Sequence, residues 1–347
     1  GDIALDDVSL QNYSTFPPTT TGVPSATPTP SFAPTPGQSP VPTSNNITTA
    51  TQVLNAISEG ATITLAADLA LWSPIVVRET LNLTLQGGGH TVDGQNRTQC
   101  FYFTDGSFVS LLDLEITRGF NPTGNAGGII FLSSSGLISG CVISNCVGSV
   151  GGAVHLYDAH VTIVRSVLSS NAAEKGGAFV ISYQSTLNLV GSSVLLNRAY
   201  DFGGVAEVRE SCIFSATSTN FTENVVTAGN GGAFYVSGGG IVELISCYLF
   251  GNQAQRASEG GGAFFASSGS VLRLNSTTVT GNAASQLNFA NVTSGLCTSS
   301  GDCFRSPNYP APYNNFDRCT MSILQGTTLQ VDFFDIQDQF DTLTVGG

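Results

Sequence analysis

Two groups of ionisable residues lie close together in the sequence and have the side chains that metal-assisted acid and base chemistry needs. They are Asp201, Glu207, Arg209 and Glu210 in one group, and Asp158 with His155 and His160 in the other. In a polysaccharide lyase, carboxylates hold calcium while an arginine or lysine removes a proton from the sugar. Neither group forms a recognisable lyase or polygalacturonase motif, and dispersed surface charge explains both. We therefore expect no catalytic residues, and keep a carbohydrate-active enzyme as the alternative function.

An internal repeat in the sequence predicts the elements that would hold these residues in place. Paired glycines followed by a small and an apolar residue begin at Gly127, Gly151, Gly176, Gly203, Gly231 and Gly261, at intervals of 24 to 30 residues. A unit of this size, with three short strands and no helix, is typical of one coil of a parallel β-helix. None of the glycine pairs opens a helix, so we interpret them as tight corners and not as a phosphate-binding loop.

Equivalent positions in the repeat predict which side chains face inward. Two apolar columns follow the glycine pairs: Ile130, Val154, Phe179, Ala206, Phe234 and Phe264, then Leu132, Leu156, Ile181, Val208, Val236 and Ala266. The column between them, Phe131, His155, Val180, Glu207, Tyr235 and Phe265, should face outward, because His and Glu are costly in an apolar core. Its aromatic members Phe131, Tyr235 and Phe265 form a candidate interface. On another strand, Glu243 and Arg273 should form an exposed ion pair.

An asparagine follows an apolar residue by three positions in each unit. The six asparagines are Asn145, Asn171, Asn197, Asn224, Asn252 and Asn282. An amide side chain both donates and accepts, so it can satisfy the backbone of a corner and bond to the next asparagine in the stack. We expect a structural asparagine ladder, and no substrate-binding role for these residues.

The chain carries signals of a secretory compartment. N-glycosylation sequons stand at Asn12, Asn46, Asn82, Asn96, Asn220, Asn275 and Asn291, and there are eight cysteines. The cysteines inside the repeat are either bridged or buried as thiols, with Cys141 and Cys146 as disulfide candidates. A formal net charge of −13 and a single lysine, Lys175, argue against nucleic acid as a partner. No apolar stretch is long enough for a membrane helix, so we expect an extracellular or cell-surface protein that inserts into no membrane.

Composition divides the chain into four parts. Residues 15–46 are rich in Pro, Thr and Ser and predict an extended, O-glycosylated linker. Residues 47–295 are the β-helix, with an N-terminal capping helix predicted over 49–60. Residues 1–14 precede the linker, and residues 296–347 follow the repeats.

The repeats resemble those of polymorphic outer-membrane proteins and adhesins, on the glycine-pair and apolar-x-x-Asn motifs over about residues 50–295. The resemblance implies a right-handed parallel β-helix, pectate-lyase-like in architecture. That class contains both adhesins and carbohydrate enzymes.

The two ends resemble pieces of β-sandwich modules. CFRSPNYPAPYNNFDRC (303–319) and FDTLTV (340–345) resemble the first half of a CUB domain. This resemblance implies that Asp341 is a candidate calcium ligand and that either Cys297 or Cys303 pairs with Cys319. GDIALDDVSL (1–10) resembles the last strand of a MAM domain. Either the chain is cut from a longer modular protein, or the N-terminal strand of one copy completes the C-terminal half-sandwich of its neighbour.

These features together predict an extracellular structural or adhesive protein. It would be a glycosylated building block of a filament or matrix, assembling through its ends with copies of itself or with other extracellular proteins and glycans. We expect no cofactor apart from calcium at the CUB-like segment.

Overall fold

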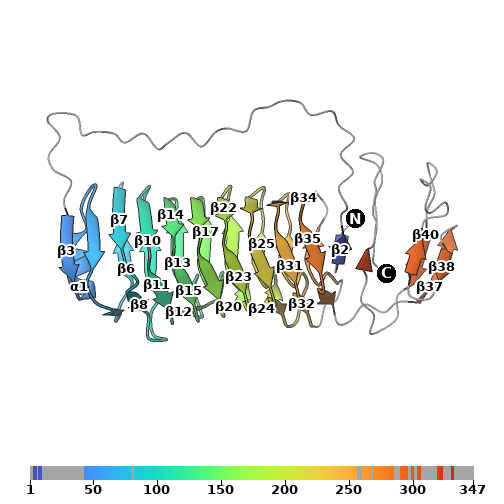
Figure 1. The fold of residues 1–347 in the computed structure, drawn as a ribbon, viewed down its shortest axis with the longest axis horizontal. Helices are drawn as coiled ribbons and strands as arrows, with labels where there is room; N and C mark the ends of the chain where they lie inside the picture. Colours follow the sequence, from blue (N-terminus) through green and yellow to red (C-terminus); the bar gives the residue numbers. More distant parts are fainter. Residues whose placement is uncertain are drawn as a thin grey trace, which may run out of the picture.

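The computed structural model is an all-β parallel β-helix, which confirms the fold class expected from the repeat (Figure 1). It describes residues 43–79, 82–255, 260–267 and 269–284, together with short strands at 3–5, 7–9, 290–295, 298–300, 303–305, 319–322 and 330–331. The coils stack along one axis in sequence order, from blue to orange in Figure 1. Residues 15–42 of the expected linker, Cys297 and Asp341 lie outside the described residues.

Four long sheets run along the axis within the described residues, whereas the repeat predicts three strands per unit. Sheet 1 contains β6 (Ile75–Val77), β9 (Phe101–Phe103), β13 (Ile129–Leu132), β17 (Val154–Tyr157), β21 (Phe179–Ser182), β25 (Ala206–Val208), β29 (Phe234–Val236), β33 (Phe264–Ala266) and β1 (Ile3–Leu5). Sheet 2 contains β3 (Thr43–Ile47), β4 (Thr62–Leu65), β7 (Asn82–Gln86), β10 (Phe108–Leu112), β14 (Ser135–Ser139), β18 (His160–Val164), β22 (Thr186–Val190), β26 (Ile213–Thr217), β30 (Ile241–Ile245) and β34 (Val271–Asn275).

The other two long sheets complete each coil. Sheet 3 contains β5 (Leu69–Ala70), β8 (Thr91–Asp93), β11 (Glu115–Thr117), β15 (Val142–Ser144), β19 (Val167–Ser169), β23 (Ser193–Leu195), β27 (Asn220–Thr222), β31 (Tyr248–Phe250), β35 (Thr278–Thr280), β2 (Asp7–Ser9) and β41 (Gln330–Val331). Sheet 4, formed by the segment of variable length, contains β12 (Phe120–Asn121), β16 (Val147–Gly148), β20 (Ala172–Lys175), β24 (Arg198–Phe202), β28 (Val225–Val226), β32 (Gln253–Ala254) and β36 (Ala283–Ala284). Two further pairs are β37 (Ala290–Gly295) with β40 (Cys319–Ser322), and β38 (Thr298–Ser300) with β39 (Cys303–Arg305).

The core is a stack of apolar side chains inside the coils. In one unit of the repeat, the observed strand register differs from the predicted alignment. Ile129, not Ile130, pairs with Val154, so Phe131 enters the core and is 0% exposed. The reason is local, because Gly128 itself occupies the small-residue position that Ala153 fills in the next coil. Gly136 leaves the space for the ring, since a Cβ there would lie 2.5 Å from the Phe131 side chain. The expected outward position of Phe131 is therefore wrong.

A buried ladder of five asparagines follows one corner of the coils. Nδ2 of Asn171 donates to Oδ1 of Asn197 at 3.0 Å, and the same bond links 197 to 224, 224 to 252 and 252 to 282. Each Oδ1 also accepts the backbone N–H of the preceding asparagine, so the corner is satisfied along the whole stack. Asn145 is not a member. It is exposed, and Cys146 takes its place in the column by donating its backbone N–H to Asn171.

A second ladder, built from hydroxyl groups, lies five residues before the first. The backbone N–H of Ser166 donates to Oγ of Ser192, and that of Ser192 donates to Oγ1 of Thr219. Cys141 and Cys247 occupy equivalent positions and donate their backbone N–H groups to Ser166 and Thr277. The constant five-residue offset from each asparagine is the sequence signal for this ladder, which our reading of the repeat overlooked.

The glycine pairs make a corner and a close contact between coils. Gly231 has φ +71°, in the left-handed region that glycine adopts at little cost. At Gly232 the restriction is space, because a Cβ would lie 2.0 Å from the carbonyl oxygen of Gly262 in the next coil. The pair therefore serves folding.

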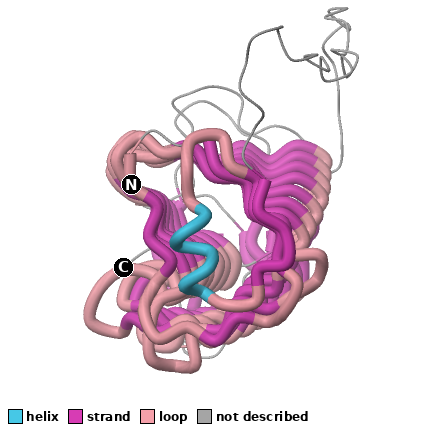
Figure 2. The backbone as a smooth tube through the Cα atoms, turned by 90° about the vertical axis from the view of Figure 1, so that its left-hand side faces the viewer, coloured by secondary structure: helices cyan, strands magenta, loops and turns pink. Residues whose placement is uncertain are grey.

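The two ends of the β-helix are covered differently. At one end α1 (Ala50–Ala56) lies across the coil, as Figure 2 shows, with Thr49 and Gln52 in a capping box and Val53 buried. At the other end the N-terminal strands return to the last coils, where β1 pairs antiparallel with β33 and β2 with β35. On sheet 2, the expected ion pair between Glu243 and Arg273 is present at the surface.

Candidate functional site

The outer face of sheet 1 holds the charged residues that the sequence singled out. His155, Val180, Glu207, Tyr235 and Phe265 stand in register on successive strands. Although this column faces away from the core, most of it is covered, and Phe265 is only 2% exposed. At Tyr235 the cover comes from sheet 4, where the ring of Phe202 on β24 packs against it.

Glu207 is the most deeply buried carboxylate of this face. Its side chain is 5% exposed, and Nη2 of Arg209 lies 2.8 Å from its Oε2 without the angle of a hydrogen bond. Burial raises the pKa of Glu207, while the positive charges of Arg209 and Lys175 partly oppose that rise. The nearby charge of Asp201 also raises it. A buried carboxylate with an incomplete set of hydrogen bonds is the kind of group that either stores electrostatic strain or serves chemistry.

His155 is the second buried ionisable group of the face. Its Nε2 lies 3.3 Å from Oγ of Ser182, which itself donates to the carbonyl oxygen of Leu156. Burial, aided by the charge of Arg209, lowers the pKa of His155 to about 4. The imidazole is therefore neutral at physiological pH. We call His155, Ser182, Glu207 and Arg209 the buried polar cluster.

An aromatic stack lies over the column next to the cluster. The ring of Phe202, on β24, is 4.3 Å from that of Tyr235, and Tyr235 stacks on Phe265 at 5.1 Å. Nζ of Lys175 lies 5.8 Å from the Phe202 ring centre. Tyr235 is thus a member of a packed stack. Lys175 and Phe202 come from the variable segment, whose length changes hide them from a column-by-column reading of the repeat.

The structure joins some of the sequence candidates and separates others. Asp201 is close enough to Glu207 to affect its pKa, whereas Glu210 lies at a corner, where Oε2 accepts the backbone N–H of Tyr183. Asp158 accepts a hydrogen bond from Ser133, and His160 lies on sheet 2, a different face from His155. The second constellation therefore does not form a site, and the carboxylate of Glu207 in the first is buried.

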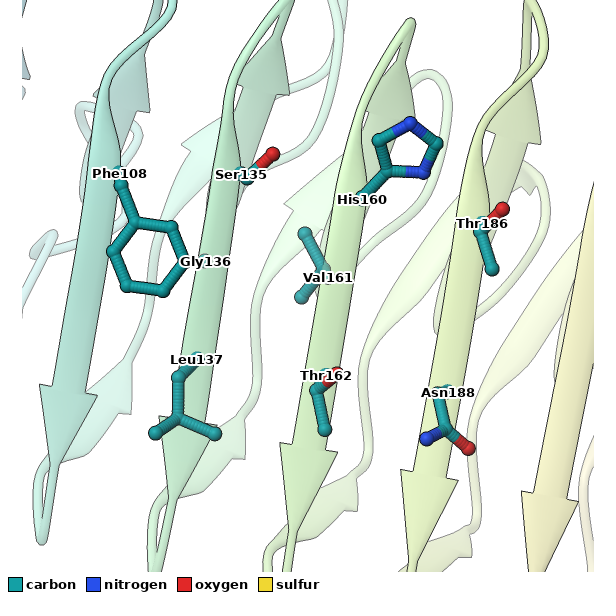
Figure 3. Close-up of a pocket in the computed structure, with 9 residues that line it drawn as sticks. All are labelled: Phe108, Ser135, Gly136, Leu137, His160, Val161, Thr162, Thr186 and Asn188. Carbon is teal, nitrogen blue, oxygen red and sulfur yellow. The ribbon is translucent and has the colours of Figure 1, made fainter. Parts of the chain in front are cut away.

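A shallow groove of about 610 Å³ crosses the outer face of sheet 2. Figure 3 shows Phe108, Leu137, His160 and Asn188 projecting from four neighbouring strands along it. The remaining lining is Ser135, Gly136, Val161, Thr162 and Thr186. Since its lining is apolar or neutral apart from His160, the groove suits an uncharged ligand with both apolar and hydroxyl surface.

The asparagines of the sequons differ from those of the ladder in their exposure. Asn46, Asn82, Asn96, Asn220 and Asn275 are all exposed, whereas the ladder asparagines are buried. Asn12 lies outside the described residues, and only the backbone is described at Asn291, in β37.

The five cysteines of the β-helix are buried thiols in the described residues. They are Cys100, Cys141, Cys146, Cys212 and Cys247. Cys141 and Cys146 are not bonded to each other, since they belong to different corner columns, and burial raises the pKa of Cys141 to about 11. Cys212 and Cys247 also lie in different columns. Of the C-terminal candidates, Cys303 begins β39 and Cys319 begins β40.

No group of three or more His, Cys, Asp or Glu side chains in the described residues is placed to hold a metal ion. No helix in the same residues has the length and apolar character of a membrane span.

Comparisons with protein-family models, with curated proteins and with solved structures gave no match to this chain.

Proposed function

We propose that the chain is an extracellular structural or adhesive protein, a glycosylated β-helix building block of a filament or matrix at the cell surface. The observation that carries the proposal is the pair of side-chain ladders that run parallel to the axis. Because each rung satisfies a buried backbone group of the neighbouring coil, bending or separating two coils would leave polar groups unpaired. A rod of this kind is stiff, as a spacer or filament subunit must be.

The sequons support the extracellular location. All five that fall among residues with described side chains have exposed asparagines, so glycans there would not disturb the core. The Pro- and Thr-rich composition of residues 15–42, which precede β3, adds an extended, O-glycosylated tether.

The ends provide a route to assembly. The edges of β33 and β35 accept β1 and β2 of the same chain, and they would accept the same strands from a neighbouring copy. Partners are therefore further copies, or other extracellular proteins and glycans that bind the CUB-like and MAM-like ends. Calcium at Asp341 belongs to this proposal.

Imaging of the native material tests the proposal. Antibody labelling should decorate filaments or matrix outside the cell, at a regular spacing. Label confined to the cell interior, or dispersed single copies that turn over sugar polymers, would contradict it.

The buried polar cluster favours a second candidate, a carbohydrate-active β-helix enzyme. A raised pKa at Glu207 beside Arg209 is the kind of arrangement that acid and base chemistry uses. Incubation with uronic-acid polymers decides between the two. Turnover that is lost in Arg209→Ala, with the fold retained by circular dichroism, would establish the enzyme.

A further inference from the structure

The sequon at Asn220 lies directly beside two exposed aromatic rings. On β27, Asn220 and Thr222 both face outward, with buried Phe221 between them. Their register partners on β31 are Tyr248 and Phe250. Strands of neighbouring coils are about 4.8 Å apart, so the glycosylation site and the rings share one surface.

The two rings lie parallel to each other, and both are partly exposed. Tyr248 is 38% exposed and Phe250 is 41% exposed. Their planes differ by 10°, and their centres are 6.0 Å apart. Gly281 of the next coil leaves room for the Phe250 ring, since a Cβ there would approach it to 2.8 Å. Two parallel aromatic faces left in water are costly unless something covers them.

The same arrangement recurs on another face of the molecule. Asn82 and Thr84 project from β7, and the register partner of Asn82 on β10 is Phe108, which is 44% exposed. Phe108 stands at the end of the groove in Figure 3. Two sequons on two sheets thus have an exposed aromatic residue at the equivalent position of the next coil.

We propose that N-linked glycans on Asn220 and Asn82 fold back on the chain, with the first N-acetylglucosamine covering Tyr248 and Phe250 at one site and Phe108 at the other. The inference rests on the secretory location proposed above. In the attachment step Nδ2 forms a bond to the anomeric carbon of a lipid-linked oligosaccharide. The bond from that carbon to the lipid diphosphate breaks, the diphosphate leaves, and Nδ2 loses one proton.

The chemistry of the sugar fits these surfaces. One face of the pyranose ring presents C–H groups, which pack on the electron-rich face of an aromatic ring, while its hydroxyl groups stay in water. At Asn82 the glycan continues over a groove lined by Leu137, Thr162 and Asn188, whose mixed apolar and hydroxyl character matches a neutral sugar. The attached glycan is therefore the occupant of both surfaces.

Asn275 provides a matched control within the same chain. It is an exposed sequon asparagine on β34, but its register partner on β30 is Ile245, which is aliphatic. A glycan there gains no aromatic surface.

The test uses the full chain secreted from a eukaryotic host, with occupancy of each sequon measured by mass spectrometry. An endoglycosidase that leaves only the first N-acetylglucosamine should leave the melting temperature unchanged. Asn220→Gln should lower it by about 2 to 4 °C. The same substitution in a Tyr248→Ser, Phe250→Ser background should produce no further shift, and Asn275→Gln should have little effect in either background.

Three outcomes would overturn the proposal. If other sequons carry glycans while Asn220 and Asn82 carry none, the secretory location stands and the stacking is excluded. A chain without any occupied sequon excludes both. If Asn220→Gln lowers the melting temperature equally with and without the two rings, the sugar does not contact them. If the serine variants fail to fold, nuclear Overhauser contacts between the first sugar and the Tyr248 ring in the unmodified sequence decide, and their absence contradicts the proposal.

Discussion

The side chain of Asn224 takes part in four hydrogen bonds among the described residues. Its Oδ1 accepts from the backbone N–H and the Nδ2 of Asn197, and its Nδ2 donates to Val194 O and to Oδ1 of Asn252. Each partner is buried, so none of them can turn to water instead. The ladder is thus a set of mutually dependent bonds, in which one residue supports two coils.

Replacement of Asn224 tests this dependence. In Asn224→Ala two donors, the backbone N–H and Nδ2 of Asn197, and two acceptors, Val194 O and Oδ1 of Asn252, each lose a hydrogen bond. Unpaired buried groups cost about 1 to 3 kcal/mol each. We expect the free energy of unfolding in urea to fall by at least about 3 kcal/mol. Asn145→Asp is the matched control. The site is exposed and left-handed, so the change should stay within about 0.5 kcal/mol. Similar losses in both variants would contradict the ladder.

Acid should weaken the fold through His155. Its folded-state pKa is about 4, below the usual 6.5, so the folded state favours the neutral ring. The stability that this provides is complete above about pH 6.5 and is lost as pH falls toward 4, by up to about 3 kcal/mol. The positive charge of Arg209 adds to the effect of burial on the pKa of His155.

Urea unfolding at pH 7 and pH 4.5 measures this loss. The free energy of unfolding should differ less between the two pH values in His155→Gln than in the original sequence. In His160→Gln this difference should stay unchanged, because His160 is exposed on sheet 2. A His155→Gln variant as acid-sensitive as the original sequence would exclude this histidine as the cause.

At the scale of the strand and coil, the glycine pairs set how closely neighbours stack. Gly232 lies so near Gly262 of the next coil that even a methyl group would clash with its carbonyl oxygen. The pairs must therefore recur in phase, which is why they were the clearest signal in the sequence.

Gly232→Ala should separate two coils and cost at least about 2 kcal/mol, since the clash is with backbone that cannot rotate away. Gly88→Ala is the control, because Gly88 has φ +59° but open space around it. That change should cost only the backbone strain of about 1 kcal/mol. Thermal unfolding of both variants compares the cost of the steric clash with the cost of backbone strain. If Gly232→Ala loses no more stability than Gly88→Ala, close stacking of the coils is not the reason for the glycine pair.

The repeat predicted the elements of the coil where its two motifs stay in phase, from Val154 onward. It failed in the preceding unit. Ile129, directly after the glycine pair, takes the position of Val154, which places Phe131 in the core, and Cys146 instead of Asn145 aligns with Asn171. Contacts such as Phe202 with Tyr235 could not be predicted. They depend on how a segment of variable length folds over sheet 1, and that segment has no period.

At the scale of the whole molecule, a β-helix must manage two open ends, since the last coil at each end exposes strand edges and core. Here α1 covers one end, and β1 and β2 extend sheets 1 and 3 at the other. The two coverings differ in kind. A helix only shields the end, whereas a strand that arrives from a distant part of the sequence can come equally from another copy.

This distinction leads to a test by complementation. A chain that lacks residues 1–9 should bind a labelled peptide of residues 1–10 with a stoichiometry of one, because the edges of β33 and β35 are then vacant. The same peptide with Ala4→Pro and Val8→Pro should not bind, since proline cannot donate to a strand edge. Fluorescence anisotropy measures both. The intact chain should bind the peptide more weakly, as its own strands compete for the edges, and equal binding of the two peptides would show that strand pairing is not what joins these ends.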